Sequence, residues 1–406
     1  MSLRSDRRWF PVLGLLVATA ATPAPQEECL SCHGSVEGIQ AAAESLGAQH
    51  ASGRLSALVV TVSPDSVHAS LACGDCHPRA SQVPHPKGMS RENPCLGCHE
   101  DAAAAVSRSV HKDPLGQGSF RAQCWHCHGA HDVRPSQDPK SSLAPANVAG
   151  TCLHCHNKQE YLVGVHGHGV QLAGLDLAAT CVSCHGGHDI LPAHDPASHV
   201  HRLNVPTTCG TCHRRVTEVY LASVHGQNLS ASNRDVPTCT DCHAAHATLD
   251  PLLPRFRNVS PEMCARCHAD PKIAGKYGLR AEVFDTYVAD FHGTTAELFV
   301  ATSPDQPLNK AVCYDCHGYH DVESVRKLGT EKVEERLLKR CQVCHPRASK
   351  KFLSAWTAHY IPDRERYPLI YYVRLFYQLV IPSTIGFFLA YIALDVWARR
   401  RQRRRQ

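Results

Sequence analysis

One five-residue pattern, Cys-x-x-Cys-His, accounts for every cysteine in this chain. The sequence has 406 residues and 22 cysteines, and the cysteines form eleven copies of the pattern. The cysteine pairs are Cys29 and Cys32, Cys73 and Cys76, Cys95 and Cys98, Cys124 and Cys127, Cys152 and Cys155, Cys181 and Cys184, Cys209 and Cys212, Cys239 and Cys242, Cys264 and Cys267, Cys313 and Cys316, and Cys341 and Cys344. The histidines that directly follow them are His33, His77, His99, His128, His156, His185, His213, His243, His268, His317 and His345.

This pattern is typical of covalent haem attachment. The two thiols form bonds with the haem vinyl groups, and the adjacent imidazole binds the iron as the proximal ligand. Structural zinc sites also use Cys-x-x-Cys pairs, but they do not require a histidine after every second cysteine. A disulfide framework would leave the histidines unexplained, and iron-sulfur clusters prefer thiolates without a trailing histidine. The sequence therefore predicts eleven covalently bound haem c groups.

The composition agrees with an interior that side chains fill only in part. The apolar fraction is 43 % with the cysteines included, and aromatic residues make up 6 %. Without the cysteines the apolar share is roughly 38 %, below the range of about 45–50 % that is usual for globular domains. We expect a mostly α and irregular fold with little sheet. It would be a multihaem cytochrome c array of short helices and loops wrapped on stacked haems, followed by one C-terminal transmembrane helix.

Histidine is the only abundant residue that can supply the sixth iron ligand. Eighteen histidines lie outside the motif positions, whereas the chain has only three methionines. We therefore expect mainly bis-histidine haems of low potential, because a methionine ligand raises the haem potential. The predicted distal ligands are His68, His85, His111, His131, His166, His188, His225, His246, His292, His320 and His359. His50 is an alternative to His68 or His85.

The predicted distal histidines occur in two settings that alternate along the chain. One setting precedes a motif, as in Ser66-Val67-His68, and the other extends a motif to Cys-His-x-x-His, as at His131. Together they define a unit with two haems, which is clearest over residues 95–320. In three copies of the first setting a tyrosine stands five residues before the histidine, at Tyr161, Tyr220 and Tyr287.

Geometry limits which histidines can share an iron. The two ligand nitrogens of one iron lie about 4 Å apart on opposite sides of the metal, whereas the imidazoles of Cys-His-x-x-His point to the same side of a helical turn. We therefore expect distal ligands to be exchanged between neighbouring haems. His359 is expected to serve the haem of Cys341 and His345.

Both ends of the chain carry membrane-targeting features. Residues 1–24 combine early arginines, an apolar stretch and small residues, which is typical of a signal peptide for general secretion or, less well matched, twin-arginine export. Residues 367–398 are predicted to form an interfacial segment and a transmembrane helix, and residues 399–406 an arginine-rich cytoplasmic tail. Residues 25–366 would then be the haem domain. We expect a single-pass protein of the bacterial cytoplasmic membrane whose haem domain faces the periplasm or the exterior.

The chain resembles the multihaem c-type cytochromes of bacterial respiration, including class III-like forms. The match is carried by Ser109-Val110-His111 followed by Cys124 to His131, and by Ser223-Val224-His225 followed by Cys239 to His246. The resemblance implies electron transfer between a quinone-linked membrane partner, such as an integral di-haem cytochrome b, and periplasmic or extracellular redox partners. No nucleic-acid partner is expected. Direct quinol oxidation and an extracellular filament are alternatives within this class.

The resemblance also leaves an enzymatic alternative open. Some multihaem relatives reduce nitrogen or sulfur oxyanions at one five-coordinate catalytic haem. The ammonia-forming nitrite reductases mark that haem with lysine in place of the motif histidine, and none of the eleven motifs here has this change. Electron transfer is therefore preferred over catalysis, and we assign no catalytic residue.

Overall fold

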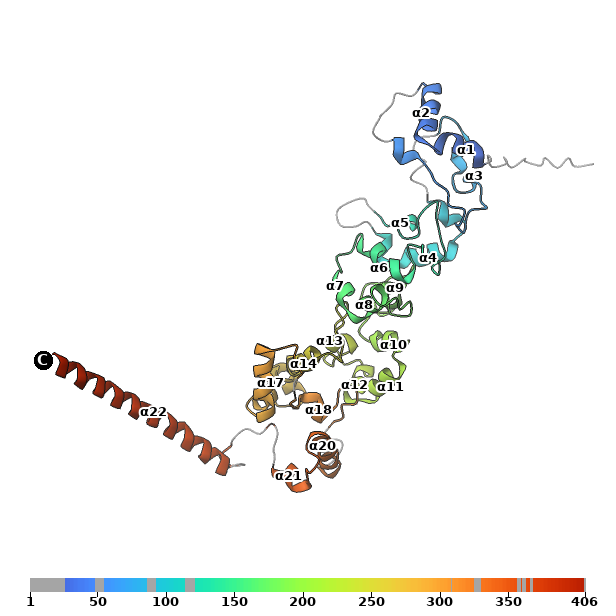
Figure 1. Ribbon diagram of the computed structural model, residues 1–406. Coiled ribbons are helices and arrows are strands. Elements are labelled where there is room, and N and C mark those ends of the chain that lie inside the picture. Colours follow the sequence, from blue (N-terminus) through green and yellow to red (C-terminus); the bar gives the residue numbers. More distant parts are fainter. Residues whose placement is uncertain are drawn as a thin grey trace, which may run out of the picture. The chain divides into compact units, whose positions relative to one another are not determined.

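The computed structural model describes residues 26–47, 55–85, 93–113, 121–307, 309–324, 330–355, 359, 363–365 and 368–404. The predicted signal peptide and His50 lie outside these residues. The described parts are helical and contain no β-strand, and short helices joined by loops make up most of them (Figure 1). The expectation of a mostly α and irregular fold is thus confirmed. The chain divides into two compact units, residues 1–204 and residues 205–406.

The first unit is built from very short helices, many of which contain a motif. Its α-helices are α1 (Gln26–His33), α2 (Val36–Ser45), α3 (Cys73–Cys76), α4 (Glu100–Arg108), α5 (Cys124–His128), α6 (Pro145–Leu153), α7 (Glu160–Val163), α8 (Val165–Gln171) and α9 (Cys181–His185). Its 3₁₀ helices include η1 (Leu55–Leu58), η2 (Pro78–Ser81), η4 (Pro94–Gly97) and η5 (Val110–Lys112).

The second unit repeats this construction and ends in one long helix. Its helices are α10 (Val205–Gly210), α11 (Arg214–Ala222), α12 (Val224–Ser230), α13 (Cys239–His243), α14 (Pro254–His268), α15 (Pro271–Lys276), α16 (Val283–Val288), α17 (Phe291–Thr302), α18 (Cys313–His317), α20 (Thr330–Cys344), α21 (Lys350–Ala355) and α22 (Pro368–Arg403). A motif forms a helix by itself in α13 and α18 and ends a longer one in α14, whereas α10 ends within the motif of Cys209.

Few large apolar side chains are buried in the described residues. The largest fully buried side chains are Val148, Val312, Asn258, Pro206 and Ser109. Side chains this small bury too little apolar surface to stabilise a chain of this length by the hydrophobic effect alone. The short helices are instead held together by specific contacts that recur from repeat to repeat.

A tyrosine that is buried or partly buried provides the first of these contacts. The hydroxyl group donates a hydrogen bond to the carbonyl group two residues before the next motif. The three copies are Tyr161 to Ala179 at 2.9 Å, Tyr220 to Pro237 at 2.6 Å and Tyr287 to Ala311 at 3.0 Å. Each bond ties the helix that directly precedes the histidine-bearing helix, α7, α11 or α16, to the attachment site of the following motif. The sequence periodicity of these tyrosines thus has a structural basis.

A glycine directly after the predicted distal histidine completes the same module. A Cβ atom at Gly167, Gly226 or Gly293 would clash with the carbonyl oxygen of the tyrosine six residues earlier. The missing side chain lets the helix that starts near the histidine pack directly on the preceding tyrosine-bearing helix.

Single backbone hydrogen bonds join repeats that are far apart in sequence. In each, the residue before a predicted distal histidine donates its N–H group to a carbonyl group two residues after a Cys-His-x-x-His histidine. The bonds are Val67 to Val133 at 2.8 Å, Val110 to Ile190 at 2.9 Å and Val224 to Val322 at 2.8 Å. They bring the two settings of the predicted distal histidines side by side.

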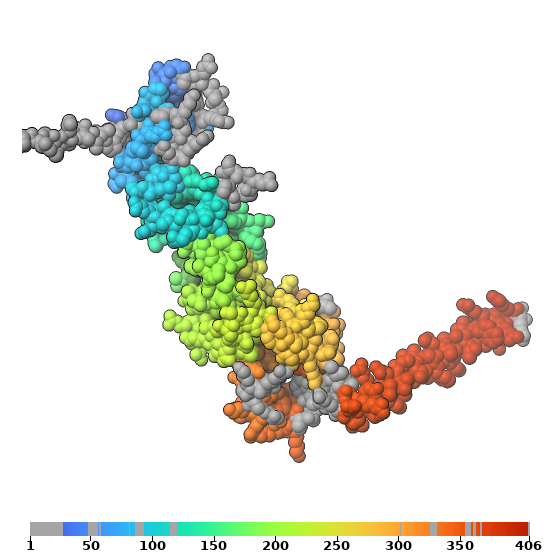
Figure 2. All heavy atoms as spheres, turned by 180° about the vertical axis from the view of Figure 1, so that it is seen from behind, coloured from blue at the N-terminus to red at the C-terminus, as the bar shows by residue number. Residues whose placement is uncertain are grey.

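The C-terminal helix α22 differs from all the others. It has 36 residues with a mean hydropathy of 1.9 over its most apolar part, so by length and composition it is able to cross a membrane. Its side chains are mostly exposed (Figure 2), and Arg399, Arg400, Arg401 and Arg403 lie in its last turns. This agrees with the expected single C-terminal apolar helix.

Candidate functional site

The structure brings eight motif histidines face to face with predicted distal histidines. In the first unit the ring centroids are separated by 5.9 Å for His33 and His85, 5.9 Å for His68 and His99, 6.3 Å for His77 and His131, 6.0 Å for His111 and His156, and 5.8 Å for His128 and His188. In the second unit they are separated by 6.3 Å for His225 and His268, 5.9 Å for His243 and His320, and 6.1 Å for His317 and His359.

The spacing of these pairs suits an iron atom between the two rings. With metal–nitrogen bonds of about 2.0 Å on either side, the centroids of two axial imidazoles lie about 6 Å apart. The angle between the ring planes varies from 18° in His33 and His85 to 61° in His68 and His99. A constant spacing with a variable angle is what axial ligands produce, because each ring can rotate about its bond to the metal.

Each pair joins histidines from different motif segments. His128 and His131, which belong to one Cys-His-x-x-His sequence, face His188 and His77 respectively. This agrees with the expectation that the two histidines of this sequence cannot bind the same iron. The segment of His128 and His131 is thereby connected to two neighbouring segments through the paired histidines.

Burial favours the neutral, metal-binding form of several paired imidazoles in the second unit. Burial, followed by the neighbouring His268, lowers the pKa of His225 to about 4. Burial is also the main cause of the lowered pKa values of His268, His317 and His359. A neutral imidazole has a free lone pair for the iron, so no proton has to be released when it binds.

A residue with positive φ separates the two histidines of each Cys-His-x-x-His sequence. The φ values are 78°, 84° and 80° at Gly129, Gly186 and Gly318, with ψ close to 180°. At the equivalent position Ala244 has a φ of 61° and a ψ of 170°. This conformation ends the motif helix directly after the proximal histidine and turns the chain, so that the second histidine points to a different partner.

Cysteines of consecutive motifs lie beside one another within each unit. The first cysteines of the motifs meet in the pairs Cys29 and Cys73, Cys95 and Cys124, Cys152 and Cys181, Cys209 and Cys239, and Cys264 and Cys313. The second cysteine of a motif approaches the following motif at Cys76 and Cys98, Cys127 and Cys155, Cys242 and Cys264, and Cys316 and Cys341. Within each unit the attachment sites therefore follow one another in space in their sequence order.

All 22 cysteines lie in the described residues, where none of them is joined to another in a disulfide bond. The residues fit haem c, with two thiols and one imidazole in each motif and a second imidazole opposite the motif histidine at eight of the motifs.

One expected pairing is wrong. His359 was expected to serve the attachment site of Cys341 and His345, but its ring lies against His317 at 6.1 Å with the planes inclined by 25°. The ring of His345 lies instead 5.5 Å from Phe352. The short sequence distance from His345 to His359 was misleading because distal ligands come from other repeats.

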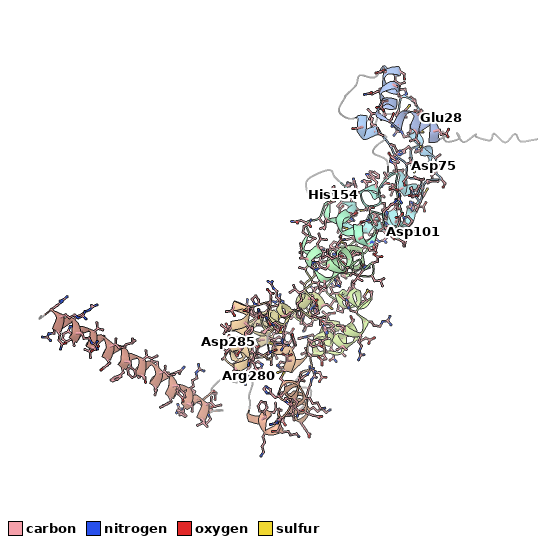
Figure 3. The ribbon with its side chains drawn as sticks, viewed as in Figure 1. Glu28, Asp75, Asp101, His154, Arg280 and Asp285 are labelled. Carbon is pink, nitrogen blue, oxygen red and sulfur yellow. The ribbon has the colours of Figure 1, made fainter. Side chains whose placement is uncertain are left out.

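The other predicted site residues stay predictions as regards their partners. These are the predicted distal ligands His166, His246 and His292 and the motif histidines His185, His213 and His345. His154, which lies between the two cysteines of its motif, is exposed (Figure 3).

Sequence analysis missed an ion pair that fixes one attachment site. The guanidinium group of Arg257 in α14 donates two hydrogen bonds to the carboxylate of Asp315, at 3.0 Å and 2.7 Å. Asp315 lies between Cys313 and Cys316, and its carboxylate also accepts a hydrogen bond of 2.7 Å from the backbone N–H of Val312. The aspartate recurs at this motif position as Asp75 and Asp241, where it accepts the same backbone hydrogen bond, but the repeated pattern gave no signal for its pairing with Arg257.

Comparison with known proteins supports the haem assignment. A family model described as a doubled CXXCH motif matches residues 232–273, which contain the motifs of Cys239 and Cys264. No curated protein and no solved structure matches the chain. The match and the repeated motifs support a multihaem c-type cytochrome. In such a protein haem c is bound covalently by the Cys-x-x-Cys-His sequences.

Proposed function

We propose that this chain is a membrane-anchored electron conduit with eleven covalently bound, mainly bis-histidine haems c. The observation that carries the proposal is the set of eight histidine pairs with centroids 5.8–6.3 Å apart. When bound, haem supplies reversible one-electron transfer at iron, and the chain sets position, axial ligands and dielectric.

The order of the attachment sites supports conduction along the chain. Within each unit the thiols of one motif lie beside those of the next. Neighbouring attachment sites hold the cofactors close together, which favours rapid transfer between them. The eleven motifs share roughly 35 residues each after signal removal, too few to insulate one cofactor from the next.

The helix α22 supports attachment to a membrane. It follows the motif of Cys341 in sequence, so this motif is the proposed port to a quinone-linked partner such as a di-haem cytochrome b. The motif of Cys29 is the proposed port to periplasmic or extracellular redox partners. The arginines at the end of α22 favour a cytoplasmic C-terminus by the positive-inside rule.

The proposal is tested by reducing the protein with a quinol analogue. Reduction is expected in membranes that contain the partner and not with the isolated chain. Equal reduction of the isolated chain would contradict the need for a partner and favour direct quinol oxidation. Control vesicles with the chain but without other membrane proteins separate the effect of the partner from that of the lipid.

The reductase alternative requires a haem with an open sixth position. A second imidazole faces eight of the motif histidines, which argues against an open sixth position at those eight sites. Electron paramagnetic resonance of the ferric protein decides between the two functions. A uniformly low-spin spectrum supports the conduit, whereas a high-spin signal that binds added cyanide supports a reductase.

A further inference from the structure

The histidine pairs follow a register that repeats along the chain. A histidine that precedes an even-numbered motif lies against the histidine of the next odd-numbered motif. His68 precedes the second motif and faces His99 of the third, and His111 precedes the fourth and faces His156 of the fifth. His225 precedes the eighth motif, and its ring faces His268 of the ninth.

Histidines of the Cys-His-x-x-His type follow a register in the opposite direction. His131, His188 and His320 each lie against the histidine of the motif two places earlier. The two registers do not overlap, because one supplies odd-numbered motifs and the other supplies even-numbered motifs. The type of sequence in which such a histidine occurs therefore indicates which motif histidine it faces.

His292 has the same local setting as His225. Each is the second residue of a helix, α17 and α12 respectively. Five residues earlier, Tyr287 and Tyr220 donate equivalent hydrogen bonds to the carbonyl group two residues before the next motif.

The residues that directly follow these two histidines also agree. A Cβ atom on Gly293 or Gly226 would clash with the carbonyl oxygen of that tyrosine. The His292 side chain is partly buried, with 23 % of its surface exposed. The two segments are thus copies of one module, and His292 precedes the tenth motif.

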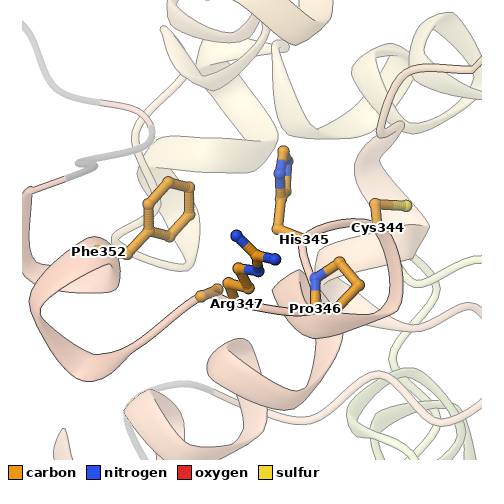
Figure 4. Close-up of a pocket in the computed structure, with 6 residues that line it drawn as sticks. Cys344, His345, Pro346, Arg347 and Phe352 are labelled. Atoms are coloured by element: carbon orange, nitrogen blue, oxygen red, sulfur yellow. The ribbon is translucent and has the colours of Figure 1, made fainter.

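The eleventh motif is the one that this register assigns to His292. The His345 ring projects into a cavity of about 410 Å³ that Cys344, Arg347 and Phe352 also line (Figure 4). His359 and His320 face other motif histidines. His246 is of the Cys-His-x-x-His type, whose register runs toward earlier motifs.

We infer that His292 is the distal ligand of the iron held by Cys341, Cys344 and His345. This inference rests on the proposed function. The terminal site next to the membrane helix in sequence then has both axial positions filled by imidazole. It exchanges electrons without binding a small substrate at its iron, and the Phe352 ring packs beside the proximal imidazole.

The test is the spin state of the ferric protein in the variant His292→Gly. Covalent haem content is measured first, because a chain without haem would overturn the proposed function itself and this inference with it. The wild type should be low-spin throughout, and the variant should gain one high-spin haem per chain. Added imidazole should return that haem to low spin. His225→Gly serves as the positive control, and the exposed His194→Ala should leave the spectrum unchanged.

The site of the new signal is identified by removing the last haem. In a chain that also carries Cys341→Ala and Cys344→Ala, His292→Gly should produce no high-spin signal. If the signal persists in this chain, His292 serves another iron and the inference is wrong. A high-spin haem in the wild type that disappears with the two cysteines would equally overturn it, as would no change in His292→Gly.

A second variant avoids the loss of a ligand. His292→Met should keep all haems six-coordinate and raise the potential of one of them, since methionine ligation raises haem potentials. An unchanged redox titration would contradict the assignment.

Discussion

Replacing Ala244 by glycine should stabilise the protein. Ala244 has a φ of 61° and a ψ of 170°, a region in which a Cβ atom is strained. The equivalent residues in three other repeats are Gly129, Gly186 and Gly318, which adopt the same backbone conformation without this strain. Among these four equivalent positions, Ala244 is thus the one at which the backbone conformation after the motif is strained by a Cβ atom.

The expected gain is about 1 kcal/mol. A non-glycine residue in this region costs about 1–3 kcal/mol. Glycine loses more conformational freedom on folding than alanine does, and this difference reduces the stability gained by the substitution by about 0.5–1 kcal/mol. For a unit of about 200 residues, a gain of about 1 kcal/mol corresponds to a rise in melting temperature of about 2–4 °C.

The assay is denaturant or thermal unfolding of the haem-loaded protein, followed by far-ultraviolet circular dichroism. Gly129→Ala is the matched control, because an added Cβ atom would meet the Asp132 carbonyl oxygen at an ordinary 3.4 Å, leaving backbone strain as its main effect. It should lower the stability by a similar amount. If Ala244→Gly lowers the stability, or if Gly129→Ala raises it, the reasoning from backbone strain is refuted.

Four further predictions concern single contacts. Tyr220→Phe removes the 2.6 Å hydrogen bond to Pro237 and should cost about 1 kcal/mol in denaturant unfolding; an unchanged midpoint would mean that the hydroxyl does not anchor the next motif. Arg257→Lys removes one of the two hydrogen bonds to Asp315 and should lower the free energy of unfolding by about 1 kcal/mol. In the control Arg255→Lys the free energy of unfolding should change little, because the contact of Arg255 to Asp305 is exposed and 3.8 Å long. Equal effects of the two variants would argue against the paired geometry. The hydrogen bond from Arg134 holds the pKa of Asp132 below its usual value. This carboxylate therefore stabilises the fold above about pH 4, and its contribution is lost as the pH falls through the lowered pKa. In Arg134→Gln the free energy of unfolding should fall less on acidification than in the wild type, and an identical pH profile would contradict this role. His225→Met should raise the potential of one haem in a redox titration, and a titration that matches the wild type would show that His225 is not an axial ligand.

The sequence predicted the fold class, because the fold class depends on local repetition. The Cys-x-x-Cys-His motifs, the tyrosines at 161, 220 and 287 and the two histidine settings recur at regular positions. The pattern fixes the local conformation of each copy. The histidine that faces a given motif is set by contacts between repeats, such as the bond from Val224 to Val322.

Such contacts leave no periodic trace in the sequence, and this explains the wrong pairing of His359. His345 and His359 are only 14 residues apart, so proximity in sequence favoured that pairing. In the structure His359 fills the position opposite His317. The pair of Arg257 and Asp315 was missed for a related reason, since a charged contact specific to one repeat cannot be found from a pattern shared by all repeats.

The central claim is that eleven motifs hold eleven haems with mainly two imidazole ligands each. The most direct measurement is the ratio of covalent haem to protein in the purified chain, together with the electron paramagnetic resonance spectrum of its ferric form. We expect a ratio of eleven and a spectrum dominated by low-spin bis-histidine signals. A ratio clearly below eleven, or a spectrum dominated by high-spin haem, would contradict the claim.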